Sequence, residues 1–451
     1  MTTPSEHSVE TTVESVGETT GESAVETAGG PVVRTEVLIV GGGPAGSAAA
    51  ITLGSAGRSV LIVDKAVFPR DKCCGDGLTT GALRELETLG LDPADVASWT
   101  VIDTVMMRSP SGREVEMRLP ERASMGQFSA VARRMDLDAA LLRCAVKAGT
   151  ALREGTALRS IRTAPDAVTA TLDDGTTVIA DLAIAADGMW SPTRRMLGLN
   201  EDGYLGEWHA FRQYITGVTG TAAERQYVWF EPDVLPGYVW SFPVDGEPGT
   251  VNFGFGVPRD GRRIPDMKGT WRDLLERPHI RAALGPDTTP VDRPTAWPIP
   301  ARIDRAVMAY GRVLFVGDSV GATDIMTGEG IGQALLTGRL AAEAIATFPQ
   351  GASARAIGER YRLDVRQHLF ADHRMSVLLG RILRYRLGAR GAIRAVATND
   401  WTRRNFVRWM FEDEPRAVLL TPRRWHRRFL TRQGAYLGHS TTVRRYAHAS
   451  D

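Results

Sequence analysis

Short apolar runs alternate with a glycine turn and an Ala-rich stretch near the start of the chain. Residues 35–40 (TEVLIV) end at three glycines, residues 44–56 are Ala-rich, and residues 59–64 (SVLIVD) form a second apolar run. Unbroken apolar runs of this length are typical of strands buried on both faces of a parallel sheet. The order of strand, glycine turn, helix and strand predicts a βαβ unit.

The pattern changes along the rest of the chain. Residues 136–148 carry apolar side chains at helical spacing, and residues 182–186 and 313–316 are further buried-strand candidates. Between about residues 205 and 258, aromatic residues are interspersed with Gly and Pro, which indicates antiparallel strands joined by turns. From about residue 330 the pattern is mainly helical and rich in Arg. We therefore predict an α/β protein in which antiparallel strands interrupt a parallel sheet.

The composition is that of a globular protein, since 43% of the 451 residues are hydrophobic and 24% are charged. These values exclude a wholly disordered chain and a small disulfide scaffold. No apolar run reaches about 18 residues, so no transmembrane helix is expected. Residues 1–30 hold six Glu, no Lys or Arg and no aromatic residue. We predict that they form a disordered acidic tail, not a signal peptide, and that the protein is cytoplasmic.

The net charge of +1 hides a basic C-terminal block, because residues 351–451 hold 21 Arg against 8 Asp and Glu. The stretches 381–387 and 422–430 mix Arg with aromatic and aliphatic residues, which suits an anionic membrane surface. Peripheral contact with the inner face of the cell membrane is therefore one hypothesis. An acidic partner and a solvated Arg-rich helical surface are the alternatives. Nucleic acid is not expected, because no binding motif supports it.

A dinucleotide-binding motif follows the first predicted strand. Residues Gly41–Gly46 (GGGPAG) fit the pattern G-x-G-x-x-G and open the predicted helix. Glycines here allow a tight turn and let a pyrophosphate approach the positive end of the helix. Asp64 ends the next strand, where a carboxylate can bind ribose hydroxyls. The motif alone does not separate FAD from NAD.

Further motifs resemble the FAD-dependent oxidoreductases that are built like aromatic hydroxylases. A strand ends in Gly317-Asp318, and in these proteins the Asp of that motif holds the ribityl chain of FAD. Asp187, in Ala-Asp-Gly, matches their mid-chain Asp-Gly motif. Arg134 matches a basic position near FAD, and we assign it in preference to the adjacent Arg133.

Two other stretches resemble the geranylgeranyl reductase family more narrowly. Residues 68–77 (FPRDKCCGDG) match P-x-x-K-x-C-G-D-G, and residues 238–243 (YVWSFP) with the later Gly254-Phe255-Gly256 match Y-x-W-x-F-P…G-x-G. Residues 327–331 (TGEGI) are similar to the loop that follows Gly-Asp in these reductases. The bacterial members that reduce one isoprene unit of menaquinone are the most similar. One departure is Asp324-Ile325, where the family usually has Asn-Pro.

The resemblance implies a Rossmann-like FAD-binding domain with an inserted antiparallel β-sheet substrate domain and a helical C-terminal region. We place the FAD-binding domain at 31–200 and 300–345, the substrate domain at 201–299, and the basic helical region at 346–451. The residues expected to bind FAD are Gly41, Gly43, Gly46, Asp64, Arg134, Asp187, Gly317, Asp318, Gly328, Gly330 and Ile331. The last three open another predicted helix, whose N–H groups can stabilise negative charge on reduced flavin.

Reduction of an isolated C=C bond needs a hydride from flavin and a proton from elsewhere. Cys73 and Cys74 are candidate proton donors, with Cys74 favoured by the family pattern, although both can equally be buried apolar residues. Lys72 can orient their loop by its charge. With Cys144, the three cysteines are too few for a disulfide framework, no Cys/His set has zinc spacing, and we expect no metal.

The aromatic residues after the turn, above all Tyr238 and Trp240, can wall an apolar tunnel for a prenyl chain, or can simply form the core of a sheet. The other members of this predicted wall are Trp229, Phe242, Phe253 and Phe255. The leading hypothesis is an FAD-dependent reductase of an isoprenoid or prenyl-quinone, with NADPH or a redox protein as external electron donor. The alternatives are a monooxygenase or halogenase on the same scaffold, and a flavin-holding interaction protein without catalysis.

Overall fold

The computed structural model describes residues 30–120, 125–244, 249–259, 266–291, 293–418, 421–422 and 432–437. The predicted acidic tail lies outside these ranges except for Gly30, and so does most of the Arg-rich stretch 422–430.

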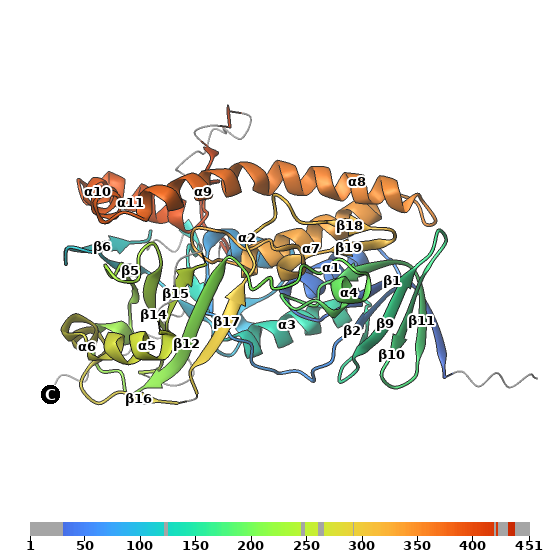
Figure 1. Ribbon diagram of the computed structural model, residues 1–451, viewed down its shortest axis with the longest axis horizontal. Coiled ribbons are helices and arrows are strands. Elements are labelled where there is room, and N and C mark those ends of the chain that lie inside the picture. Colours follow the sequence, from blue (N-terminus) through green and yellow to red (C-terminus); the bar gives the residue numbers. More distant parts are fainter. Residues whose placement is uncertain are drawn as a thin grey trace, which may run out of the picture.

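The first layer is a sheet at the N-terminal end of the molecule (Figure 1). Strand β1 (Val32–Val40) lies between β11 (Thr177–Ala185) and β2 (Val60–Val63), and all three run parallel. Five of the nine β1 residues are buried, as expected for a strand inside a parallel sheet. The predicted strands at 35–40, 59–64, 182–186 and 313–316 are therefore confirmed. The sheet is completed by β8 (Ala151–Arg153), β9 (Leu158–Thr163), β10 (Val168–Leu172), β18 (Ala309–Tyr310) and β19 (Val313–Phe315).

Helices α1 (Pro44–Ser55) and α7 (Ile331–Ala346) pack closely together on this sheet. The approach depends on Gly338, since a Cβ at that position would lie 2.0 Å from the carbonyl oxygen of Ala45. This close packing places α1 beside α7, although the two helices are far apart in the sequence. The other helices of this part are α2 (Thr80–Thr88), α3 (Arg134–Lys147) and α4 (Pro192–Met196).

A second sheet forms the opposite end of the molecule (Figure 1). Its central strands are antiparallel, as predicted for residues 205–258, but β13 (Gln226–Trp229) also pairs in parallel with β5 (Thr104–Arg108). The segment predicted as FAD-binding, 31–200, thus contributes two strands to this sheet. The remaining strands are β6 (Glu114–Arg118), β12 (Trp208–Thr216), β14 (Tyr238–Pro243), β15 (Val251–Pro258), β16 (Thr289–Pro290) and β17 (Thr295–Ile299), and helices α5 (Met267–Glu276) and α6 (Pro278–Leu284) pack on one face.

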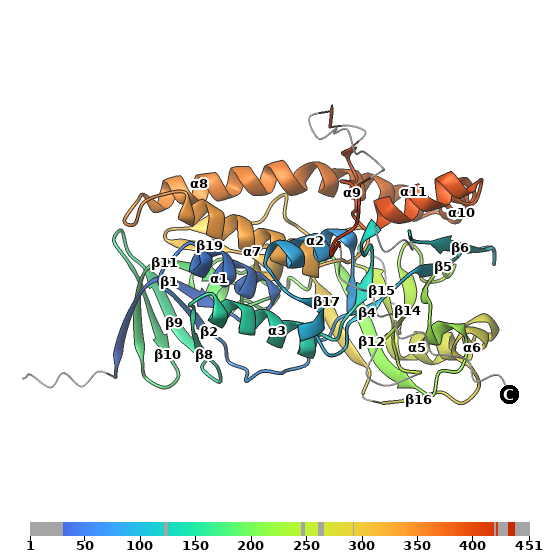
Figure 2. The same ribbon diagram turned by 180° about the vertical axis from the view of Figure 1, so that it is seen from behind.

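The C-terminal helices extend along the molecule over both sheets (Figure 2). Helix α8 (Ala354–Val365) continues through a π-helical turn at Arg366–Phe370 into α9 (Ala371–Leu383), which reaches the second sheet. Two shorter helices, α10 (Arg386–Val396) and α11 (Asp400–Met410), complete this layer. A small sheet of β3 (Gly77–Leu78), β7 (Ala130–Val131) and β4 (Thr100–Val101) lies between the two ends. Within the described ranges, no helix combines the length and apolarity needed to cross a bilayer.

Candidate active site

One large cavity joins the two sheets and the C-terminal helices. Its volume is about 970 Å³, at the upper end of the range for small-molecule sites. The lining includes the glycine turn before α1, the end of β2, the aromatic strand β14 and the inner side of α9 to α11. Of the sixteen residues predicted for the site, fifteen line this cavity, and only Gly46 does not.

The glycine turn has the geometry of a pyrophosphate cradle. Gly41 has φ +106°, and Gly43 faces the cavity with its nearest possible side-chain contact at 3.6 Å, on Arg70. Gly46 instead lies under the turn, where a Cβ would come within 1.8 Å of the Gly41 carbonyl oxygen. The three glycines therefore serve a tight turn, close approach of a ligand and packing of helix on strand, respectively.

Asp64 stands at the end of β2 and holds the same turn. Its Oδ2 accepts a hydrogen bond of 2.7 Å from the Gly42 N–H, and its Oδ1 accepts one of 2.8 Å from the Ala66 N–H. Both oxygens retain further lone pairs, and the residue lines the cavity. A ribose hydroxyl can therefore bind Asp64 without breaking the contacts to the turn.

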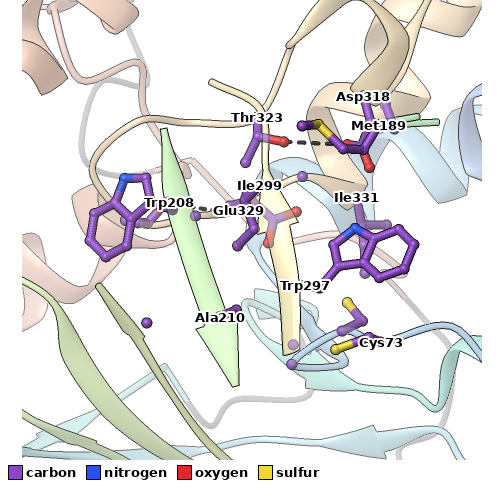
Figure 3. A pocket seen from close by; sticks show the side chains of 18 of the residues that line it. Cys73, Met189, Trp208, Ala210, Trp297, Ile299, Asp318, Thr323, Glu329 and Ile331 are labelled. Carbon is purple, nitrogen blue, oxygen red and sulfur yellow. Dashed lines mark hydrogen bonds between the residues drawn. The ribbon is translucent and has the colours of Figure 1, made fainter. Parts of the chain in front are cut away.

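The Gly-Asp motif lies beside the cysteine loop in the cavity lining. The Gly317 N–H donates to Thr337 Oγ1 of α7 at 2.9 Å, which anchors the motif to that helix. Asp318 Oδ2 lies 3.2 Å from Lys72 Nζ, and Asp318 also accepts from Thr323 Oγ1 at 3.4 Å (Figure 3). Lys72 therefore joins the two motifs by an ion pair.

The predicted helix after residue 330 is confirmed, because α7 begins at Ile331. Its N-cap is Gly330, so no side chain at the N-cap position covers the first N–H groups. Gly328 has φ +71°, and the nearest atoms to a Cβ there are 3.8 and 3.9 Å away, on Ile299 and Tyr238. Backbone N–H groups and the positive end of α7 thus open onto the cavity. Together with the glycine cradle and the two carboxylates, this arrangement fits FAD.

Arg134, at the start of α3, and Asp187, after β11, both line the cavity. Arg134 is buried and holds Asp138 through two hydrogen bonds of 2.8 and 2.7 Å, whereas the adjacent Arg133 does not line the cavity. Asp187 caps the short helix α4, since its Oδ2 accepts from the Thr193 N–H at 2.8 Å. Burial raises the pKa of Asp187.

The cysteine loop is held by a hydrogen-bond network centred on Asn252 of β15. The Asn252 amide donates to the Cys74 carbonyl oxygen at 2.7 Å and to Asp76 Oδ2 at 2.8 Å, and it accepts from Trp240 Nε1 at 3.1 Å. Asp76 Oδ2 also accepts from the Tyr214 hydroxyl at 2.5 Å. The loop that carries both thiols is thereby fixed to the second sheet.

Both thiols are free, and both cysteines are partly buried. Burial raises the pKa of Cys73 to about 12, and its Sγ donates to the Thr295 carbonyl oxygen at 3.6 Å. Burial also raises the pKa of Cys74, although the Arg134 guanidinium opposes this shift. The Asp76 N–H donates to Cys74 Sγ at 3.4 Å. Both residues are therefore neutral thiols near pH 7, and the surroundings of Cys74 contain two groups that stabilise a thiolate.

The comparison with known proteins agrees with this geometry. Residues 34–371 match the family model described as "FAD binding domain". Menaquinone reductase of Mycobacterium tuberculosis is 35% identical over 337 residues, which cover 68% of this chain and 76% of that protein. The chain belongs to the geranylgeranyl reductase family of FAD-dependent oxidoreductases. This enzyme therefore uses FAD.

Other members of the geranylgeranyl reductase family are also similar. A digeranylgeranylglycerophospholipid reductase of Methanoculleus marisnigri is 29% identical over 326 residues, covering 68% of this chain and 75% of that one. The crystal structure of a geranylgeranyl bacteriochlorophyll reductase-like protein from Thermoplasma acidophilum has a TM-score of 0.72 at 20% identity, and covers 87% of this chain and 100% of that chain. The latter comparison shows that the predicted fold is correct.

In this family member, Tyr238, Trp240 and Phe242 of β14 form one wall of the cavity, because alternate residues of a strand face the same side. Gly254 of β15 makes room for this wall, since a Cβ there would lie 2.2 Å from Trp240 Cζ2. The Tyr238 hydroxyl donates to the Thr327 carbonyl oxygen, which ties the aromatic wall to the turn before α7.

The other three aromatic residues follow the alternative of a sheet core. Trp229, Phe253 and Phe255 are fully buried in the core between the second sheet and Trp271 of α5. Phe253 and Phe255 do not line the cavity, because Gly254 and Gly256 occupy the alternate positions of β15, on the side that faces Trp240. Trp240 pairs with Gly254, so the residues on either side of Gly254 point to the opposite face of the sheet. This alternation distinguishes the cavity-lining aromatic residues from those in the core.

Sequence reasoning gave no role to several residues that shape the site. Asp76 and Glu329 lie within the motifs that identify the family, but no role was predicted for either side chain. Trp208 and Trp297 come from β12 and β17, which pair with each other, and both line the cavity (Figure 3). Burial and the nearby Glu412 raise the pKa of Glu329 to about 8, so this cavity-lining carboxyl is largely protonated near pH 7.

The C-terminal helices supply a wall that the sequence did not indicate. Their contribution to the cavity lining is mainly apolar, and it includes Val377, Leu379, Leu383, Ala389, Ala392, Ile393, Phe406, Trp409, Met410 and Phe411. The region predicted as a basic surface block thus has an inner face that belongs to the active site.

Proposed function

We propose that this enzyme saturates a C=C bond in the prenyl chain of a menaquinone-type substrate. The observation that carries the proposal is the continuity of the cavity, whose polar end holds the FAD-binding motifs and whose other end is walled by β14 and the C-terminal helices. An apolar chamber that opens onto the cofactor end matches an isoprenoid chain, which offers no polar group along its length. The menaquinone reductase similarity supports the same substrate class.

FAD, when bound and reduced, supplies the hydride. The chain supplies the proton, and we assign this role to the Cys74 thiol. Its raised pKa keeps the proton on Sγ at neutral pH, and transfer to the alkene carbon leaves a thiolate. The Asp76 N–H, 3.4 Å from Sγ, and the charge of Arg134 stabilise that thiolate. Cys73, whose Sγ is directed to a backbone carbonyl, is the second thiol to test.

Tyr238 and Trp240 orient the chain and exclude water. The Tyr238 hydroxyl donates to the Thr327 carbonyl oxygen and Trp240 Nε1 donates to Asn252. Both polar groups are therefore paired within the protein, and the rings present apolar surface to the substrate. Lys72 is a positioning residue in this scheme, because its charge is paired with Asp318.

The decisive experiment is anaerobic incubation of the FAD-loaded protein with dithionite and menaquinone or geranylgeranyl lipids, followed by mass spectrometry. A gain of two hydrogens per reduced bond supports the proposal, and loss of that gain in Cys74→Ala with FAD still bound supports the assigned proton donor. No gain without air, together with an added oxygen or halogen on aromatic compounds under air with NADPH, would establish the monooxygenase or halogenase alternative.

The electron donor is an external one in this proposal. NADPH or a small redox protein reduces the bound FAD in a transient encounter, because the chain carries a single dinucleotide fingerprint. Stopped-flow reduction of the bound flavin by NADPH would support a nicotinamide donor. Absence of reduction by NADPH, with rapid reduction by a ferredoxin or flavodoxin, would assign the role to a redox protein.

The enzyme meets its lipid substrate at a membrane, through the outer side of α9 and α10. We define the apolar patch as Leu378, Ile382, Tyr385 and Leu387, whose exposed fractions run from 49% to 79%. Arg381 and Arg386 flank it and are also exposed. A mixed apolar and cationic surface binds anionic bilayers by insertion and charge attraction together.

Liposome pelleting tests the patch directly. The double variant I382E/L387E should lose salt-sensitive pelleting with anionic vesicles, while Leu363→Glu should pellet like the wild type, since Leu363 is 64% exposed but lies on α8 outside the patch. Equal pelleting of all three proteins would contradict membrane contact at this surface.

A further inference from the structure

A buried ion pair joins the C-terminal segment to the turn before α7. Arg416 pairs with Asp324 Oδ2, and the two side chains are 2% and 5% exposed. Ser376 of α9 donates to the same carboxylate oxygen at 3.0 Å. Arg416 lies beyond residue 371, where the match to the FAD-binding family model ends.

The second oxygen of Asp324 organises the turn itself. Asp324 Oδ1 accepts from the N–H groups of Met326 and Thr327 at 3.0 and 2.7 Å, and from Thr327 Oγ1 at 2.8 Å. The main chain closes the same turn, because the Asp324 N–H donates to the Glu329 carbonyl oxygen at 2.8 Å and the Gly328 N–H donates to the Asp324 carbonyl oxygen at 3.0 Å. One carboxylate therefore holds the loop that presents Gly328 and Gly330 to the cofactor site.

The charge of Asp324 explains why a cation is required. A carboxylate removed from water is costly unless it is paired and hydrogen-bonded. Arg416 supplies this pairing, and its second terminal nitrogen, Nη2, lies 3.4 Å from Glu412 Oε1. The carboxyl of Glu329 is close enough to the same guanidinium to interact electrostatically. Arg416 is thus the cation within a group of three carboxyl groups at the edge of the cavity.

We propose that Arg416 is a positioning residue for bound FAD, which fixes the Asp324–Gly330 turn and balances its negative charge. This inference deepens the same site, and it depends on FAD binding but not on the identity of the prenyl substrate. Loss of Arg416 leaves an unbalanced negative group near the flavin, which disfavours the added negative charge of reduced flavin. Loss of the Asp324 charge has the opposite effect.

The test compares the midpoint potential of bound FAD in four proteins: wild type, Arg416→Met, Asp324→Asn and the double variant. We expect Arg416→Met to lower the potential, Asp324→Asn to raise it, and the double variant to return toward the wild-type value. We also expect FAD to bind at least about tenfold more weakly to Arg416→Met than to the wild type, with partial recovery in the double variant. Opposite shifts from two partners are not produced by loss of stability alone.

Arg408→Met provides the matched control. Arg408 is in the same segment, its side chain is 6% exposed, and it pairs with the fully buried Asp413 instead of the turn. The Arg408→Met variant should have a lower melting temperature as the apoprotein, but the midpoint potential and visible spectrum of its bound FAD should be unchanged. If Arg416→Met behaves in the same way as Arg408→Met, the proposal is wrong.

Two further outcomes keep the test decisive. If Arg416→Met does not fold, Asp324→Asn decides, because an unchanged potential in that variant overturns the proposal and a raised potential supports it. Failure of the wild type to reduce any prenyl lipid would overturn the proposed function, while opposite shifts in potential would still support the role of Arg416.

Discussion

Lys72 Nζ lies 3.2 Å from Asp318 Oδ2, although the two residues are 246 positions apart in the sequence. The contact joins the cysteine loop to the Gly-Asp motif. It therefore fixes the loop of the proposed proton donor, Cys74, relative to the proposed ribityl-binding carboxylate, Asp318. Both side chains remain partly exposed, at 25% and 18%. Pairs of this kind contribute about 1 kcal/mol or less.

Replacement of Lys72 should therefore have a modest effect on the cofactor. We expect Lys72→Met to weaken FAD binding by about two- to fivefold, because a cation beside an anionic ligand is lost. The loss should shrink at high salt, where exposed charges are screened. Titration of the apoprotein with FAD at two salt concentrations measures it. Lys268→Met, at an exposed position on α5, should bind FAD like the wild type.

A methyl group at Gly46 should be far more damaging. The Cβ of Gly46→Ala would lie 1.8 Å from the Gly41 carbonyl oxygen, so the turn and α1 must separate. We expect loss of measurable FAD binding and a lower melting temperature. Gly391→Ala is the control, since nothing lies within 4 Å of its Cβ, and there the helix should gain up to about 1 kcal/mol. Retention of FAD by Gly46→Ala would contradict the assigned packing role.

The two glycines of β15 that lie next to Trp240 offer a similar contrast. A Cβ at Gly254 would lie 2.2 Å from Trp240 Cζ2, whereas the nearest atom to a Cβ at Gly256 is 3.4 Å away, on Trp208. We expect Gly254→Ala to displace Trp240 and raise the KM for a prenyl substrate at least about tenfold, with FAD affinity unchanged. Gly256→Ala should change KM much less. Equal effects of the two substitutions would show that Trp240 does not wall the substrate chamber.

The thiols should react slowly with alkylating agents. Because burial raises the pKa of Cys73 to about 12, only a small fraction is thiolate at pH 8, and the alkylation rate should still be rising at pH 10. Mass spectrometry of iodoacetamide-treated protein over this pH range, with free glutathione as the reference, measures the rate. A plateau below pH 9 for Cys73 would show that its surroundings are wetter than the structure indicates.

Asp76 should make stability depend on pH in the weakly acidic range. Burial raises the pKa of Asp76 to about 6, although the Tyr214 and Asn252 hydrogen bonds oppose the shift. The folded state then holds this proton more tightly than the unfolded state, whose pKa is about 3.9, so stability is lost as pH rises from about 4 to 6. The size of this contribution is about 3 kcal/mol.

Asp76→Asn removes that titration. Denaturant unfolding of both proteins at pH 4.5 and pH 7 isolates the effect, because other groups titrate equally in each. The wild type should lose more stability than Asp76→Asn between the two pH values. Identical losses would mean that Asp76 does not titrate in this range.

Local patterns in the sequence were sufficient for much of the fold. The βαβ unit, the strand before Gly317 and the helix at Ile331 each follow from apolar runs next to glycines, because these elements depend on neighbouring residues. The pairing of β5 with β13 joins residues more than a hundred positions apart. No local pattern encodes such a partner, and the predicted FAD-binding segment 31–200 therefore included β5 and β6, which belong to the second sheet.

The candidate site divides in the same way. Motif residues such as Gly41, Asp64 and Asp318 line the cavity. Asn252 and Arg416 could not be found in this manner, because each acts on a loop that is distant in sequence and neither lies in a recognisable motif. For Phe253 and Phe255 residue type left a wall and a core both open, and strand alternation places them in the core.

The cavity is built from two sources with different constraints. One side is the FAD-binding scaffold, and the other includes helices α9 to α11, which lie largely or wholly beyond the matched family region. Substitutions on these helices can lengthen, shorten or reshape the chamber while the redox centre stays the same. Chimeras that exchange this segment between relatives are therefore a direct route to enzymes of the same chemistry with new chain-length selectivity, provided that the Arg416–Asp324 junction is transferred intact.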